Sequence, residues 1–387
     1  MIYNFEKYKN ENEFLKEIDE EKFLDLLNEN EELRCNTISM LSGLRNQMAE
    51  HCKLDNVVFL FGNGTSIYAG TKSTVKGNLE EIYKKDEYKS LSSIISVLTN
   101  KTIEEQLNVL LICQKYFTLS GEIEKISALT SLISDIKKTL LNDYVNSIDY
   151  SNLIHHEILF RKLRNMNLIN KVTLFTTNYD LAFEYSMDNI SLEYSNGFTG
   201  FVNRRFDLKT LQSTNKLKLY KIHGSVNWEY ADGDIIEKQP KFSKGKLEDM
   251  NNHNDVLIFP TSKKMEETFN TPYSELMRGM LDVLEAKRNV VFVLGYRYRD
   301  EHINEILLKS ISNPNNIYYF FDFDDDNSEF IKKIEKISEF TQNIFILKGK
   351  FIANFAVFSD YVFPSIASKT DEESIRDLLK KVLKENE

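Results

Sequence analysis

Cysteine and proline are scarce in this sequence, and the scarcity of cysteine excludes two kinds of structural reinforcement. The three cysteines, Cys35, Cys52 and Cys113, are too few and too scattered to build a disulfide framework. None of them forms a Cys-x-x-Cys pair, so a structural zinc site has no obvious ligands. Only five prolines interrupt the chain, and no repeat or low-complexity segment is present. We therefore expect a reduced globular protein that binds no metal.

Long apolar runs and an excess of positive charge are missing as well. No apolar run approaches the ~20 residues that a membrane-spanning helix needs, and the N-terminus lacks a basic-then-apolar signal pattern. The net charge of -10 argues against a general surface for nucleic acid or anionic membranes, because phosphate binding needs clustered Lys and Arg. Basic pairs such as Arg204 and Arg205, or Lys263 and Lys264, still leave room for a small anionic ligand. A cytoplasmic protein without direct nucleic-acid or membrane binding is expected.

Short, continuous apolar runs recur along the chain and predict buried strands. The first, over 56–61, is rich in β-branched and aromatic residues and is followed by glycine, which is typical of a strand buried on both faces. Similar runs occupy 172–176, 217–222, 256–259, 290–294, 317–323 and 344–347. Because long connections separate them, we expect an α/β protein with a mainly parallel sheet and helices on both faces.

The segments between and outside these runs follow a helical period. Residues from Asn10 to about Lys53 alternate apolar and charged side chains at helical spacing, and the block from about 70 to 170 does the same. That block is too long for a loop, so it predicts an inserted helical subdomain. A capping box of Thr370 and Glu373 predicts a C-terminal helix. We expect a helical segment over 1–55, a main domain over 56–330, and a C-terminal strand and helix over 331–387 that completes the domain or mediates assembly.

A glycine-rich turn follows the first predicted strand. Its sequence is Gly62-Asn63-Gly64-Thr65-Ser66, and such glycines let a backbone approach a pyrophosphate beside a helix N-terminus. Ile67 stands where a third Rossmann glycine would be, and the spacing does not fit a Walker loop. Taken alone, the motif is equally well an ordinary strand-to-helix turn.

Polar residues also end the second and third predicted strands. Thr177-Asn178-Tyr179-Asp180 follows one of them, at the edge where open α/β sheets bind ligands. His223-Gly224-Ser225 follows the other, and a histidine near neutral pKa suits proton transfer. The alternatives are a turn whose Asn and Asp cap the next helix, and a histidine satisfied by local hydrogen bonds.

A fourth strand-end motif and an acidic cluster complete the candidates. Gly295-Tyr296 closes the run over 290–294, and this glycine again permits a close backbone approach to a ligand, although a plain strand-to-helix turn is as good a reading. Four aspartates at 322 and 324–326 lack the glycine and spacing of a calcium loop. Of these, Asp322 is the one placed to face a ribose.

In order along the chain, the four motifs resemble those of the sirtuin-like family. They are Gly-Asn-Gly-Thr-Ser at 62–66, Thr-Thr-Asn-Tyr-Asp at 176–180, Lys-Ile-His-Gly-Ser at 221–225 and Gly-Tyr-x3-Asp-x-His-Ile-Asn at 295–304. The sequence looks most like a bacterial branch whose members act as NAD hydrolases in antiphage defence, and the resemblance covers about 50–325. It implies a Rossmann-like fold that binds NAD.

The resemblance also implies roles for individual residues. Asn178 would order the nicotinamide ribose and the reacting water, Asp180 would hold the carboxamide, and His223 would act as the base. The residues implied to line the NAD site are Gly62, Asn63, Gly64, Thr65, Ser66, Thr177, Gly224, Ser225, Gly295, Tyr296 and Asp322, with the first loop along the phosphates and adenosine.

One departure from sirtuin deacylases shapes the expected reaction. Those enzymes carry a four-cysteine zinc module, and this chain has no such set and a helical insertion instead. Without an acyl-lysine acceptor, cleavage of the glycosidic bond would end in water and release nicotinamide and ADP-ribose. The expected protein is an NAD glycohydrolase that depletes NAD in abortive antiviral defence. The resemblance also implies a homo-oligomer and a partner protein such as a HerA-type ATPase. The alternatives are a non-catalytic NAD or ADP-ribose sensor or assembly subunit, and, beyond it, a protein deacylase or ADP-ribosyltransferase.

Overall fold

The structure is a computed structural model that describes residues 2–4, 31–72, 76–99, 101, 103–202, 204–231, 234–248, 272–323 and 328–365. Five features of the sequence analysis lie wholly or partly outside these residues: the helix before Glu31, the strand over 256–259, the basic pair at 263–264, the aspartates at 324–326 and the C-terminal helix that begins near Thr370. Within the described residues, the predicted helical segment over 1–55 contains α3 (Glu31–His51). Ile2–Asn4 instead form a strand that pairs with the main sheet, which the helical prediction missed because three residues are too few to show a period.

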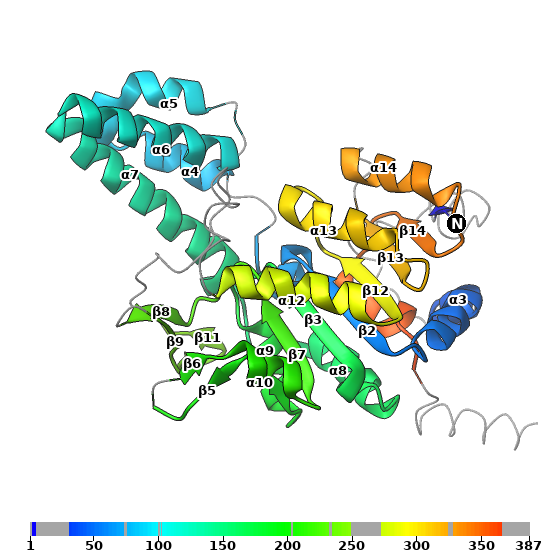
Figure 1. The fold of residues 1–387 in the computed structure, drawn as a ribbon. Coiled ribbons are helices and arrows are strands. Elements are labelled where there is room, and N and C mark those ends of the chain that lie inside the picture. The colour runs from blue at the N-terminus through cyan, green and yellow to red at the C-terminus, as the bar shows by residue number, and fades with distance from the viewer. Residues whose placement is uncertain are drawn as a thin grey trace, which may run out of the picture.

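An eight-stranded sheet forms the centre of the fold (Figure 1). Every pairing in it is parallel, as the continuous apolar runs predicted. The six predicted strands that fall in the described residues are all present. In spatial order the strands are β1 (Ile2–Asn4), β14 (Ile344–Lys348), β13 (Ile317–Asp322), β12 (Asn289–Leu294), β2 (Asn56–Phe61), β3 (Val172–Thr176), β7 (Leu217–Lys221) and β4 (Tyr194–Ser195).

The chain winds outward from β2 in both directions. It first builds β3 and β7 on one side, and then returns to place β12, β13 and β14 on the other. Strands β2 and β12 are therefore neighbours although more than 200 residues separate them, with Asn56 opposite Asn289 and Phe61 opposite Leu294. This is the topological switch point of a doubly wound sheet, the place where such folds bind ligands at the carboxyl ends of the strands.

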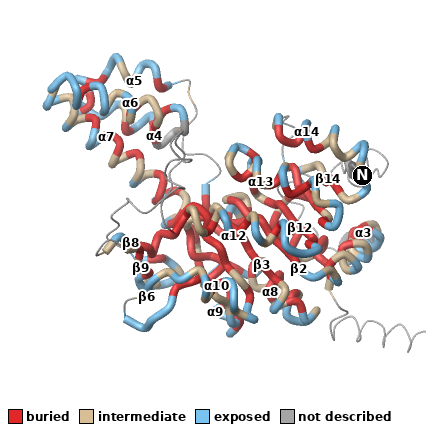
Figure 2. The backbone as a smooth tube through the Cα atoms, in the orientation of Figure 1, coloured by how far each residue is buried: buried red, intermediate tan, exposed pale blue. Residues whose placement is uncertain are grey.

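Alternate residues of the central strands contribute to two hydrophobic cores, one on each face of the sheet. Figure 2 shows that these strands are mostly buried. In β2, Val57, Phe59 and Phe61 enter the first core, and Val58 and Leu60 enter the second. The first face is covered by α3, α8 (Ile154–Asn165), α9 (Ala182–Asn189), α15 (Phe355–Val357) and the π-turn η7 (Phe358–Val362). The second is covered by α10 (Leu208–Ser213), α12 (Tyr273–Ala286), α13 (Glu301–Ile311) and α14 (Glu329–Ser338).

A helical arm interrupts the sheet between β2 and β3 and projects from the body of the protein (Figure 1). Its longest helix, α7, buries Leu129, Leu132, Ile136 and Leu140, which recur at helical spacing as predicted. The predicted α/β class with an inserted helical subdomain is confirmed, while the domain limits stay a prediction. The arm contains α4 (Lys76–Tyr83), the 3-10 turn η3 (Asp86–Leu91), α5 (Ser92–Leu98), α6 (Ile103–Ser120), α7 (Ile123–Leu141) and the π-turn η4 (Asn142–Asn146).

A second, antiparallel sheet was not predicted from the sequence. Its strands, and those of a separate two-stranded ribbon, are two to four residues long, too short to show the alternation that marks a strand. In spatial order the sheet comprises β5 (Phe198–Thr199), β6 (Arg204–Phe206), β9 (Asp234–Glu237) and β8 (Trp228–Ala231), and the ribbon comprises β10 (Phe242–Ser243) and β11 (Lys246–Leu247).

The antiparallel sheet places acids beside one of the basic pairs. Arg204 forms an ion pair with Glu237, and Arg205 forms one with Asp234 at 2.8 Å. Both acids lie on the neighbouring strand and offset the charge of the two arginines. No helix in the described parts of the chain combines the length and apolar character that crossing a bilayer requires.

Candidate functional site

The four strand-end motifs meet at the carboxyl edge of the parallel sheet. Backbone hydrogen bonds tie neighbouring motifs together where the strands end. Gly62 donates its N–H to Leu294 O (3.1 Å), Thr177 donates to Phe61 O (3.1 Å) and Ile222 donates to Thr176 O (3.0 Å). The sheet order therefore brings together residues from four distant parts of the sequence, with the switch point between β2 and β12 among them.

The glycines at the switch point are required by contact between two loops. A Cβ on Gly62 would lie 2.5 Å from Gly295 O, and one on Gly64 would lie 2.7 Å from Gly295 Cα. Gly295 itself has a φ of +67°, and its Cβ would lie 2.8 Å from Thr65 N. The sequence motif suggested a close approach to a ligand. In the structure the backbone that demands glycine is that of the neighbouring loop.

Asn178 is buried beside the hydroxyls of the first loop. Its Nδ2 donates to Thr65 Oγ1 (3.2 Å) and Ser66 Oγ (3.3 Å). Both hydroxyls already donate elsewhere, Thr65 to Gly62 O and Ser66 to Asp180 Oδ2, so they can only accept from Asn178. This fixes which way the amide points.

The amide oxygen of Asn178 is the exception in this network. Oδ1 is buried and has no hydrogen-bond partner among the described residues. Buried acceptors are rarely left without a donor, because losing water without gaining a hydrogen bond costs about 1–3 kcal/mol. The orientation of the amide therefore presents an acceptor suited to a hydroxyl, an amide N–H or a water.

Asp180 is buried and engages both of its carboxyl oxygens within the protein. Oδ1 accepts from the N–H of Ala182 (2.9 Å) at the start of α9, and Oδ2 accepts from Ser66 Oγ (3.1 Å). Burial raises the pKa of this carboxyl above its ordinary value, and the nearby charge of Lys221 opposes the shift. In this arrangement Asp180 orients Ser66 and the first turn of α9.

His223 lies in the tight turn after β7, one strand away from Asn178. Gly224, with a φ of +90°, closes that turn by donating its N–H to Lys221 O (3.1 Å). The imidazole is buried, and its ring centre lies 5.6 Å from that of His302 on α13. His302 belongs to the fourth motif, but sequence reasoning did not single it out as a site residue.

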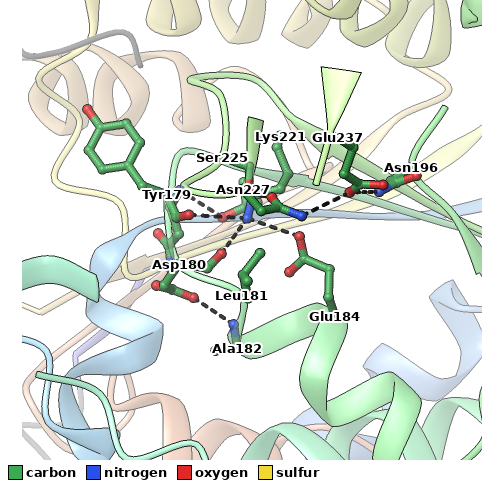
Figure 3. A network of polar contacts seen from close by, with 12 residues as sticks. Tyr179, Asp180, Leu181, Ala182, Glu184, Asn196, Lys221, Ser225, Asn227 and Glu237 are labelled. Atoms are coloured by element: carbon green, nitrogen blue, oxygen red, sulfur yellow. Dashed lines mark hydrogen bonds and ion pairs between the residues drawn. The ribbon is translucent and has the colours of Figure 1, made fainter. Parts of the chain in front are cut away.

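Ser225 anchors the His223 turn to the antiparallel sheet (Figure 3). Its hydroxyl donates to Asn227 Oδ1 (2.6 Å), and Asn227 Nδ2 donates to Glu237 Oε1 (3.3 Å). Asn196 donates to the same carboxylate oxygen (2.6 Å). Burial raises the pKa of Glu237, and the ion pair with Arg204 opposes that shift. The network uses Ser225 to hold the turn in place.

The remaining predicted site residues lie around this centre. Asn63 donates to Lys72 O (3.3 Å), Thr177 is half-buried, and the Tyr296 hydroxyl donates to Asp300 O (3.1 Å). Asp322 ends β13, the strand next to β12, and is buried at the same edge of the sheet. Among the described residues, no group of three or more His, Cys, Asp or Glu side chains is arranged to hold a metal ion.

Sequence reasoning missed two buried charged residues beneath this edge. Lys221 belongs to the third motif, and its ammonium is 3.0 Å from a carboxylate oxygen of Glu184 on α9. Figure 3 shows this pair beside the segment that carries Tyr179 and Asp180. A lone lysine and a lone glutamate gave no periodic signal, and a fully buried Lys–Glu pair is uncommon.

Comparison with known proteins finds a family match for part of the chain. The family model described as the SIR2-like domain matches residues 172–345. Among curated proteins, none matches this sequence. Similar solved structures include a Sir2 mutant with a p53 peptide and NAD (12% identity, 89% of this chain and 97% of that chain, TM-score 0.34). Another is a Sir2 homolog–NAD complex (10% identity, 82% and 91%, TM-score 0.38). The matched segment, residues 172–345, runs from β3 into β14 and contains Asn178, His223 and Gly295, so this part of the chain is similar to the SIR2-like domain.

Proposed function

We propose that this protein is an NAD glycohydrolase that cleaves NAD to nicotinamide and ADP-ribose. The observation that carries the proposal is the buried Asn178 amide, whose oriented oxygen lacks a partner among the described residues at the ligand-binding edge of a doubly wound sheet. The buried His223 on the adjoining strand end and the SIR2-like domain match support it.

The reaction requires little covalent chemistry from the protein itself. The bond between the ribose C1′ and the nicotinamide nitrogen breaks, and nicotinamide leaves as a neutral molecule with the electron pair. Water then adds to the positively charged ribose and loses a proton, so NAD⁺ and water give ADP-ribose, nicotinamide and H⁺. Asn178 Oδ1 would accept a hydrogen bond from the water or a ribose hydroxyl, and His223 would take the proton.

We propose hydrolysis, and not removal of an acyl group from a lysine side chain, because of the segment inserted between β2 and β3. The insertion there is a helical arm, and the chain has too few cysteines for a four-cysteine zinc module. Water is then the acceptor that is always present. In this proposal Asp180 supports the site through Ser66, and each of its oxygens, which now accepts one hydrogen bond, could accept a second one from the carboxamide.

The wider role that we propose is depletion of NAD in defence against phage by a self-associating protein that acts with a partner such as a HerA-type ATPase. An exposed apolar face on α6 supports self-association, since Ile112, Tyr116 and Leu119 follow one another at helical spacing with 66%, 63% and 89% of their surface exposed. The mass of the purified protein in solution, compared with that of an Ile112→Glu/Leu119→Glu variant, tests this part.

Incubation with NAD, alone and with candidate partners, tests the proposed activity. We expect nicotinamide and ADP-ribose to accumulate in equal amounts, and Asn178→Ala and His223→Ala each to slow turnover by roughly 100-fold or more. Asn189→Ala, at the exposed end of α9, is the matched control and should keep full activity.

Three outcomes would contradict the proposal. Normal turnover in both Asn178→Ala and His223→Ala would place the chemistry elsewhere. Tight NAD binding without turnover under any condition would indicate a sensor or assembly subunit. Turnover that requires an acyl-lysine peptide, or labelled protein, would indicate a deacylase or an ADP-ribosyltransferase.

A further inference from the structure

A buried lysine contacts the backbone of the loop that carries Asn178. Lys221 is the last residue of β7 and is 2% exposed. Its ammonium donates to the carbonyl oxygens of Tyr179 (3.4 Å) and Asp180, and it forms an ion pair with Glu184 (Figure 3). A lysine this deeply buried must be paired to remain charged, and here all the partners shown come from the segment after Asn178 or from the helix that follows it.

The same loop is also held by the backbone of the His223 turn. Val226 donates its N–H to Tyr179 O (2.9 Å), so this carbonyl accepts both from Lys221 and from the turn. Lys221 itself precedes His223 by two residues. One side chain therefore joins the end of β7, the backbone just after Asn178 and the first turn of α9.

We propose that Lys221 is a positioning residue that fixes the Asn178 loop relative to the His223 turn, and that Glu184 neutralises the charge of Lys221. The peptide groups of Tyr179 and Asp180 point their oxygens at the ammonium, which fixes the direction of the backbone on the C-terminal side of Asn178. The effect of Lys221 on NAD turnover rests on the proposed function. Its effect on the hydrogen exchange of the loop does not.

A double substitution separates positioning from stability. Removing one member of a buried ion pair strands the other, whereas replacing both by apolar residues of similar volume is often neutral for stability. Lys221→Met/Glu184→Leu should therefore melt close to the wild type. Glu184→Gln alone should lower the melting temperature but keep the lysine on the two carbonyls.

The experiment compares melting temperature, NAD turnover and amide hydrogen exchange in the wild type, Lys221→Met, Glu184→Gln, the double variant and Lys218→Met. Lys218 lies on the same strand, and its ammonium binds Gln212 O near the surface, so it serves as the matched control. We expect the double variant to lose roughly 10- to 100-fold in turnover despite its restored stability, because a displacement of the order of 1 Å is enough to cost that much. Glu184→Gln should stay within about threefold of the wild type.

Hydrogen exchange tests the inference without NAD. The amides of residues 178–182 should exchange at least tenfold faster in Lys221→Met and in the double variant, but not in Lys218→Met. If turnover follows melting temperature across all the variants and these amides are unchanged, Lys221 only stabilises the fold and the inference is wrong. If the wild type consumes no NAD, the proposed function fails, and the exchange of residues 178–182 still decides the role of Lys221.

Discussion

Hydrogen bonds at Asn178 show how a single side chain can be held ready for a ligand. Its nitrogen is shared between two hydroxyls that are themselves committed as donors, to Gly62 O and to Asp180. The amide therefore cannot flip without losing these contacts. Its oxygen is left without a hydrogen-bond donor among the described residues. Preorganisation of this kind favours a hydroxyl or water over a carboxylate or phosphate ligand, because those would bring two acceptors together.

Substituting Gly64 by alanine tests the packing at the switch point. The new methyl group would lie 2.7 Å from Gly295 Cα and 3.0 Å from Gly295 O, so one of the two loops must move. We expect a loss of about 1–3 kcal/mol in the free energy of unfolding, measured by denaturant titration, and slower NAD turnover because Thr65 moves with the loop.

Gly43→Ala is the matched control for that change. Gly43 lies on α3 with nothing within 4 Å of its Cβ position, so alanine should stabilise the protein by up to about 1 kcal/mol. Equal effects of the two substitutions would show that contact between the loops does not explain the glycine at position 64.

At the scale of elements, the turn η2 (Asn63–Ala69) is linked to α8 by a contact between the half-buried Tyr68 and the buried His156. The Tyr68 hydroxyl lies 2.6 Å from His156 Nδ1. The His156 ring packs against Phe183 and Phe355, at 4.9 Å and 4.5 Å between ring centres. Thr65 and Ser66 share this short turn with Tyr68, so helix α8 helps to place the hydroxyls that hold Asn178.

This pair makes stability depend on pH. Burial lowers the pKa of His156 to about 3 from its ordinary value of 6.5, so between these two values the unfolded chain binds a proton that the folded chain does not. The contribution is therefore present above pH 6.5 and is lost as the pH falls toward 3. About 2 kcal/mol should disappear between pH 7 and pH 5.

Denaturant midpoints of the wild type and His156→Gln at both pH values measure this contribution. The variant is expected to be less stable at pH 7 but to lose less on acidification. Other groups, such as Asp180 and Glu237 with their raised pKa values, titrate in both proteins and cancel in the comparison. The same loss of stability in the two proteins would show that His156 is not buried in its neutral form.

At the scale of the whole molecule, the helical arm shares one hydrophobic core with loops at the carboxyl edge of the sheet. The cluster that contains Leu98 and Leu107 of the arm also contains Leu181 next to α9 and Val226 after the His223 turn. An arm that packs against the loops of the site in this way should not unfold on its own.

Ile136→Ala in the middle of α7 tests this cooperativity. Ile136 is fully buried, so the change should cost about 2–5 kcal/mol. The single tryptophan, Trp228, lies on β8 outside the arm and reports on the body of the protein, while far-ultraviolet circular dichroism reports mainly on helices. We expect both signals to shift together in thermal unfolding. An earlier transition seen by circular dichroism alone would mean that the arm unfolds independently.

The sequence alone determined the class of the fold and the residues to inspect. Continuous apolar runs predict buried parallel strands because both faces of such a strand contact the core, and polar motifs directly after those runs must lie at one edge of the sheet. This reasoning located Asn178, His223 and Gly295 and predicted the helical arm from its period. The short antiparallel strands escaped it because they hold too few residues to show a period.

Only the tertiary structure decided which of these residues contact one another. Ser66 and Asp180 are 114 positions apart, and Gly62 meets Gly295 because β2 and β12 are neighbours in the sheet. Such contacts depend on the order of strands, which local periodicity does not encode. The buried pair of Lys221 and Glu184 became visible for the same reason, since a charged side chain can be recognised as buried only when its partner has been placed beside it.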